Sequence, residues 1–141
     1  MASRRQARER ALQALYQEEV AGETPGAEAL FWRHFDADEE AGPFARELVA
    51  GVRAERERID ALLAEAVEHW DLRRLARVDL SLLRLAVYEM MARPEIPHAV
   101  TIDEAVEIAG RFGSADSPAF VNGVLDRVAR VLGRKPAGGP S

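Results

Sequence analysis

Four arginines lie within the first ten residues, at Arg4, Arg5, Arg8 and Arg10, against a single acid, Glu9. This segment is therefore basic, whereas the 141-residue chain carries a net charge of −5. A guanidinium presents N–H donors in a planar fork that matches phosphate and carboxylate groups. On a helix, the first three of these arginines fall within one sector of about 100°. The spacing favours an anion-binding face, and an exposed basic terminus with no ligand is the alternative.

A second candidate lies where a short loop, residues 113–116, enters a helix. Ser117 is predicted as the N-cap and Pro118 as the first helical residue. Unpaired backbone N–H groups at such a start bind a phosphate or a base edge. Phe120, one turn further on, has the type of side chain that stacks an unpaired RNA base, although its spacing also fits core packing. Asp116 and Ser117 are alternatively no more than caps.

The residues needed for common catalytic and metal chemistry are missing or isolated. The chain has no cysteine, which removes thiolate ligands, a cysteine nucleophile and disulfides. His34, His69 and His98 have no partner at metal-ligand spacing. Glu104 and Glu107 are typical of a solvated helix face rather than a catalytic pair. The sequence therefore predicts no catalytic residues, no metal and no cofactor.

Nothing in the sequence suggests secretion or membrane insertion. The basic start lacks the apolar stretch of a signal peptide. The most apolar segment, residues 80–92, is interrupted by Arg84 and Glu89. We therefore expect a cytoplasmic protein that does not interact with membranes.

Apolar residues recur at helical spacing along nearly the whole chain, and no alternating strand pattern is present, so the expected class is all-α. Capping-box patterns at Ser3 with Gln6 and at Thr101 with Glu104 predict two helix starts. The segment 75–92 has almost no polar side, which predicts a central buried helix. The predicted helices cover residues 3–21, 28–35, 42–70, 75–92, 101–112 and 117–133.

Three segments carry a resemblance to the NusB family of bacterial transcription antitermination factors. They are RRQARERALQALY from Arg4 to Tyr16, LRLAVYE from Leu83 to Glu89, and VTIDEAVEIAGRFGSADSPAFVNGVL from Val100 to Leu125. Because three motifs occur in the family's order across most of the chain, the match is more specific than one motif alone. The resemblance implies about seven helices in two packed subdomains, here residues 1–72 and 73–133. The tail over residues 134–141 is rich in glycine and proline, which predicts that it is disordered.

The resemblance also implies a non-enzymatic function. Proteins of this family bind the boxA element of nascent ribosomal RNA transcripts together with the ribosomal protein NusE, within the RNA polymerase antitermination complex. The residues implied to bind RNA are Arg4, Arg5, Arg8, Arg73, Asp116, Ser117 and Phe120. Those implied to face NusE are Tyr16, Val20, Asp79 and Leu83. Gln6 departs from the longer arginine run of many relatives, which lowers the expected number of phosphate contacts.

Two other functions are compatible with the same sequence. A NusB-like domain also occurs in ribosomal RNA cytosine methyltransferases, so the chain could be a related stand-alone RNA-binding domain. A helical adaptor whose arginine helix docks on an acidic protein or an anionic membrane is the other alternative. A monomer and a weak homodimer both fit the sequence.

Overall fold

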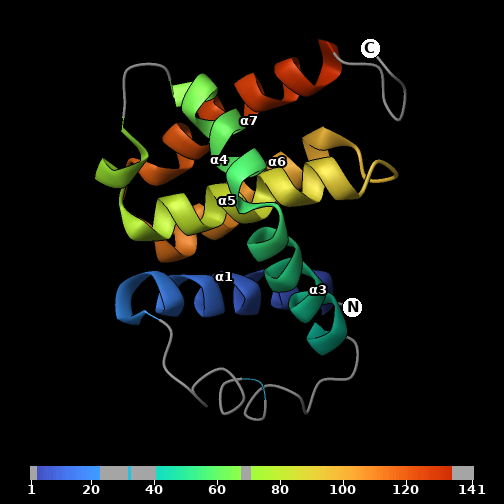
Figure 1. Ribbon diagram of the computed structural model, residues 1–141, viewed down its shortest axis with the longest axis vertical. Helices are drawn as coiled ribbons and strands as arrows, with labels where there is room; N and C mark the ends of the chain where they lie inside the picture. The colour runs from blue at the N-terminus through green and yellow to red at the C-terminus, as the bar shows by residue number, and fades with distance from the viewer. Residues whose placement is uncertain (1–2, 23–31, 33–40, 68–70, 135–141) are drawn as a thin grey trace.

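The computed structural model describes residues 3–22, 32, 41–67 and 71–134. Within these ranges the chain forms helices and no strand, which confirms the predicted all-α class (Figure 1). The predicted helix 28–35 and the predicted disordered tail lie outside the described residues, apart from Trp32 and Arg134. The elements are α1 (Ser3–Ala21), α3 (Ala41–Ala54), α4 (Arg56–Val67), a 3-10 turn η1 (Leu72–Arg74), α5 (Arg77–Ala92), α6 (His98–Phe112) and α7 (Ser117–Arg134).

Helix α5 is the centre of the molecule, as its apolar sequence predicts. It packs against α1, α3, α4, α6 and α7, and Figure 1 shows it crossing the middle of the bundle. Four leucines and one valine of α5 are almost inaccessible to solvent, with exposed fractions of 2% or less: Leu80, Leu82, Leu83, Leu85 and Val87. Every other α-helix therefore depends on α5 for part of its buried surface.

The single helix predicted over residues 42–70 is wrong, because the chain turns at Glu55 between α3 and α4. Backbone hydrogen bonds continue across the turn, from the Glu55 N–H to the Gly51 carbonyl and from the Ile59 N–H to the Glu55 carbonyl, both at 2.9 Å. The two halves bury their apolar sides against different neighbours, α3 against α1 and α5, and α4 against α5 and α7. The change of neighbour explains the change of direction.

The predicted capping box at Thr101 and Glu104 is also wrong. Helix α6 begins three residues earlier, at His98, after Pro97 at the N-cap. Thr101 is thus inside the helix and buried, and its hydroxyl donates to Glu89 Oε2 at 3.2 Å. Glu104 accepts hydrogen bonds from Arg5 instead. At the other predicted box, the Ser3 side chain lies outside the described part of the structure.

The proposed division of the chain after residue 72 stays a prediction. Helix α4, assigned by that division to the first subdomain, packs on α5 and α7. One continuous cluster of buried apolar side chains contains residues of all six described α-helices.

Candidate RNA and partner interface

The arginine cluster at the start of α1 separates into three different environments. Arg8 is buried: its Nε and Nη2 donate to Glu89 Oε1 and Oε2 at 2.8 and 2.7 Å. The side chains of Arg8 and Glu89 are 8% and 1% exposed. The expectation that Arg8 contacts RNA directly therefore does not fit the structure, because its side chain is buried and its guanidinium is bound to carboxylates of α5 and α6. Arg8 holds α1 against α5.

Arg5 is more accessible but is also engaged. Its Nε and Nη2 donate to Glu104 Oε1 and Oε2 at 3.0 and 2.6 Å, and Nη1 lies 3.7 Å from Glu107 Oε2. These hydrogen bonds and charges lower the pKa of Glu104 and raise the pKa of Arg5. The Arg5 side chain is 39% exposed. A phosphate that reaches Arg5 must therefore compete with a bound carboxylate.

Arg4 is the most available cation of the three. It is exposed, and among the described residues it makes no ion pair. Its guanidinium carbon lies 5.0 Å from the centre of the Phe44 ring, and the guanidinium of Arg93 lies at the same distance from that ring. Arg93 is itself paired with Glu47. The ring therefore supports Arg4 without neutralising its charge.

The polar side chains at the predicted loop of residues 113–116 and the start of α7 differ in their exposure to solvent. Asp116 is exposed, and its carbonyl accepts the Phe120 N–H at 3.1 Å. Ser117 is 1% exposed, and its Oγ donates to Asp79 Oδ1 at 2.7 Å. Ser117 Oγ also accepts the Ser114 N–H at 3.0 Å. Because α7 begins at Ser117 and the Asp116 carbonyl accepts its first hydrogen bond, Ser117 is not the N-cap that we expected. Its burial excludes it from direct contact with a ligand in this conformation.

Phe120 fits both predicted roles in part, base stacking and core packing. It is half-buried and packs against the core cluster, yet a part of its surface remains accessible. It lies one turn into α7, next to the exposed Asp116. A base could stack on the accessible part without any change in the core.

Arg73 lies apart from the arginines of α1. Its side chain is 89% exposed and pairs with Asp71, whose pKa is lowered to about 2, chiefly by the hydrogen bond from the Arg73 side chain. Its carbonyl accepts a hydrogen bond from Arg77, which in turn binds Glu19 near the end of α1. Glu19 is 14 residues from Arg5, or about 21 Å along a helix. The structure thus does not join Arg73 to Arg4 and Arg5.

The residues implied to face NusE also divide into exposed and buried groups. Tyr16 and Val20, one turn apart on α1, are 39% and 59% exposed. Asp79 and Leu83 on α5 are 9% and 0% exposed. The implied contact of Asp79 and Leu83 with NusE does not fit this burial, since α5 is enclosed by its neighbours. Leu83 is part of the hydrophobic core and has no surface available to a partner.

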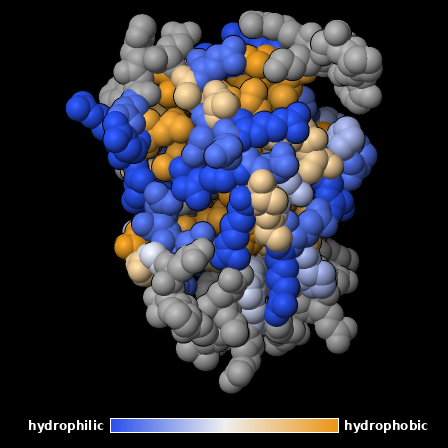
Figure 2. Space-filling model, in the orientation of Figure 1, coloured by the Kyte–Doolittle hydropathy of each residue, from blue (hydrophilic) through white to orange (hydrophobic). Residues whose placement is uncertain are grey.

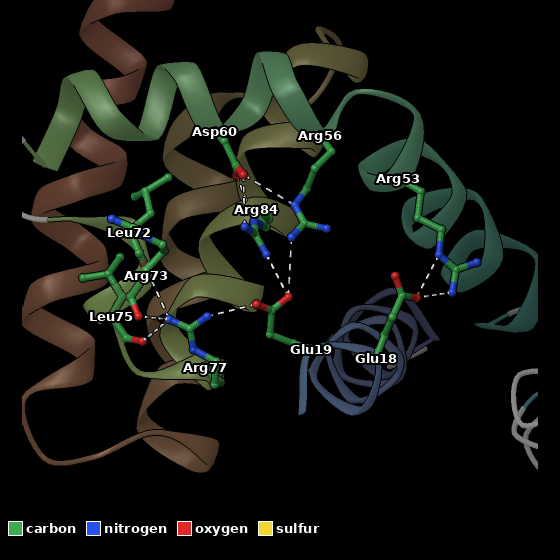
Figure 3. A network of polar contacts seen from close by, with 10 residues as sticks. All are labelled: Glu18, Glu19, Arg53, Arg56, Asp60, Leu72, Arg73, Leu75, Arg77 and Arg84. Atoms are coloured by element: carbon green, nitrogen blue, oxygen red, sulfur yellow. Dashed lines mark hydrogen bonds and ion pairs between the residues drawn. The ribbon is translucent and has the colours of Figure 1, made fainter. Parts of the chain in front are cut away.

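Sequence reasoning missed a polar network that joins α1, α4 and α5 (Figure 3). Glu19 accepts hydrogen bonds from Arg77 at 2.9 Å and Arg84 at 3.2 Å, and Arg84 also donates to both oxygens of Asp60. Arg56 approaches Glu19 and Asp60 at 3.5 and 3.4 Å. The available signal was the pair of arginines on an otherwise apolar helix. This network orients the part of α1 that carries Tyr16 and Val20.

The described part of the chain has a mixed surface, with neither a metal-binding cluster nor a membrane-spanning helix. Hydrophilic side chains cover the middle of the face in Figure 2, between patches of hydrophobic residues. Within the described residues, histidines and carboxylates do not gather in threes at a distance suited to a metal ion. None of the described helices has the length and apolarity to cross a membrane.

The all-helical bundle, in which an arginine-bearing first helix is tied to a central apolar helix, has the fold of antitermination factors of known structure. The model of the NusB family matches residues 5–130, and the chain belongs to this family. The transcription antitermination protein NusB of Sorangium cellulosum is 48% identical, covering 95% of this chain and 96% of its own length. The NusB protein of Myxococcus xanthus is 49% identical, with 95% and 99% covered.

Solved structures show the same fold. A structure of T. maritima NusB is 38% identical with a TM-score of 0.78, covering 90% of each chain. A chain in a crystal structure of the antitermination factors NusB and NusE with double-stranded RNA is 26% identical. Its TM-score is 0.80, and the match covers 93% of this chain and 98% of that chain.

Proposed function

We propose that this protein is an RNA-binding transcription antitermination factor that binds boxA RNA of nascent ribosomal RNA transcripts together with NusE. The observation that carries the proposal is the full-length match to a chain in the complex of NusB and NusE with RNA. The geometry supports it, because Arg4 is an accessible cation and Asp116 and Phe120 border an accessible loop. The protein works without catalysis or cofactor, in the cytoplasm, as a monomer or weak homodimer within the RNA polymerase antitermination complex.

The roles of the candidate residues follow from their exposure. Arg4, Arg5, Asp116 and Phe120 contact the RNA, and Arg73 is a more distant contact for a longer strand. Arg8 and Ser117 hold the elements that present these side chains. Tyr16 and Val20 contact NusE, since two exposed apolar side chains one turn apart form a suitable surface for a protein partner.

The test is a titration of labelled boxA RNA with this protein, with NusE, and with both proteins together. We expect the pair to bind more tightly than either protein alone, by about 5- to 150-fold, the usual range for coupled sites. A permuted RNA of the same length and composition is the control, since phosphate contacts alone do not distinguish sequences. Equal affinity of the pair for boxA and permuted RNA would contradict the proposed function.

A further inference from the structure

The first turns of two helices meet at one buried hydrogen bond. Asp79 is the third residue of α5, and Ser117 is the first residue of α7. The Ser117 hydroxyl donates to Asp79 Oδ1 at 2.7 Å, and the two residues are 1% and 9% exposed. A carboxylate is favoured at this place, because the amino-terminal end of a helix carries partial positive charge. The bond therefore fixes the start of α7 to the start of α5.

The same hydroxyl also determines the shape of the preceding loop. A serine hydroxyl has one proton to donate, and a carboxylate can only accept, so the proton is directed to Asp79. A lone pair of Ser117 Oγ then accepts the Ser114 N–H at 3.0 Å. Gly113 packs so closely that a Cβ there would lie 2.4 Å from this oxygen and 2.6 Å from Ser117 Cβ. Loop residues 113–116 are thus built around Ser117, and Ser117 is oriented by Asp79.

We infer that Asp79 is a positioning residue for RNA binding, which acts through Ser117 to place the loop of residues 113–116 and Phe120 against the RNA. This inference rests on the proposed function and changes the role that the family resemblance implies for Asp79. It explains why a carboxylate and a serine, 38 positions apart, are buried together below an exposed loop.

The test compares four variants for binding to boxA RNA in the presence of NusE. Asp79→Ala and Ser117→Ala each remove the bond, and we expect about three- to tenfold weaker RNA binding, the fold-change that one hydrogen bond provides. The double variant should be no weaker than the single ones, since both remove the same interaction. Asp79→Asn keeps the Oδ1 acceptor, and we expect RNA affinity close to that of the wild type.

Two further measurements separate positioning from a contribution to stability alone. The Ser114 amide resonance should shift in Asp79→Ala and return to its wild-type position in Asp79→Asn. Binding to NusE in the absence of RNA should be unchanged in both variants. The matched control is Ser81→Ala, which removes another buried hydroxyl of α5, two residues from Asp79, and should leave RNA affinity unchanged.

A glycine variant tests the same contact from the loop side. Gly113→Ala adds a methyl group that pushes Ser117 away, so its RNA affinity should fall like that of Ser117→Ala. Gly133→Ala, with no atom within 4 Å of the added carbon, is its control.

Wild-type RNA affinity in folded Asp79→Ala and Ser117→Ala would overturn the inference and make the bond purely structural. Weaker NusE binding with unchanged RNA binding would overturn it in favour of a partner contact. Failure of the wild-type protein to prefer boxA would instead refute the proposed function.

Discussion

The buried guanidinium of Arg8 donates two hydrogen bonds to the carboxylate of Glu89, from Nε to Oε1 at 2.8 Å and from Nη2 to Oε2 at 2.7 Å. The two residues are 81 positions apart in the sequence. Thr101 donates a third hydrogen bond to the same carboxylate. An arginine of an apparent RNA-binding cluster is thereby part of the core. This relationship changes which substitutions report on RNA binding and which report on folding.

Arg8→Ala should strongly reduce the free energy of unfolding. Loss of the guanidinium leaves Glu89 as a buried charge without its partner, which costs about 3–5 kcal/mol. Urea unfolding measures this loss directly. Arg130→Ala is the control, because its pair with Asp126 on α7 is exposed and contributes only about 0.3–0.5 kcal/mol.

The double variant Arg8→Met, Glu89→Met distinguishes a charge effect from a packing effect. It should recover much of the stability, since no unpaired buried charge remains. An Arg8→Ala variant as stable as the Arg130→Ala control would show that the pair contributes little.

Replacing Arg4 and Arg5 together by alanine should reduce the salt dependence of RNA binding. Each phosphate contact contributes about −0.7 to the slope of log K against log salt on single strands, so the slope should flatten by roughly 1.4. Arg4 should account for the larger share, because Arg5 is already paired with Glu104. Titrations at several salt concentrations provide the slope. Arg58→Ala, an exposed arginine of α4, is the control, and a double variant with the control's slope would exclude both arginines from the site.

Tyr16→Ala and Val20→Asp should each weaken binding to NusE without changing the affinity for RNA alone. An aromatic anchor at an interface often contributes more than about 1.4 kcal/mol, which is a tenfold change in affinity. Calorimetric titration with NusE measures the change. Val100→Asp places the same charge at a 45% exposed valine of α6 and should bind NusE normally. Wild-type isotherms for both α1 variants would place the partner surface elsewhere.

The Arg5–Glu104 pair should make the free energy of unfolding depend on acidic pH. Hydrogen bonds and charge from Arg5 lower the pKa of Glu104 in the folded protein from the usual 4.5. A lowered folded pKa stabilises the native state fully above pH 4.5, and this contribution is lost as the pH falls through the folded value. Urea midpoints of the wild type and Glu104→Gln should therefore converge below pH 4.5. If the pair were negligible, the midpoint of Glu104→Gln would follow that of the wild type over the whole acidic range.

Local sequence patterns were sufficient to predict most helices, but not the turn between α3 and α4 or the start of α6. The predicted end of α1 at Ala21 is confirmed, because Gly22 adopts a left-handed conformation with φ of 74°. The turn at Glu55 was not predictable from periodicity, since each half has a normal apolar stripe and only the neighbours differ. The start of α6 was misplaced because Thr101 resembles a cap in sequence but is used to bind Glu89.

The arginine cluster was recognisable from the sequence, whereas the burial and the partner of each arginine were not. Arg8 and Arg5 meet carboxylates 81 and 99 positions away, and no local pattern identifies such partners. The burial of Asp79 and Ser117 depends in the same way on two helix starts that meet only in the folded chain.

The long separation between α1 and α6 has a consequence during synthesis. Arg5 can pair with Glu104 only after Glu104 has been synthesised. Glu9 likewise can pair with Arg111, 102 positions later, only after that residue has been synthesised. At about 5–20 residues per second, translation leaves the first helix without these partners for roughly 5–20 s. Throughout that interval the nascent chain presents an unneutralised basic segment close to the RNA of the ribosome that is making it.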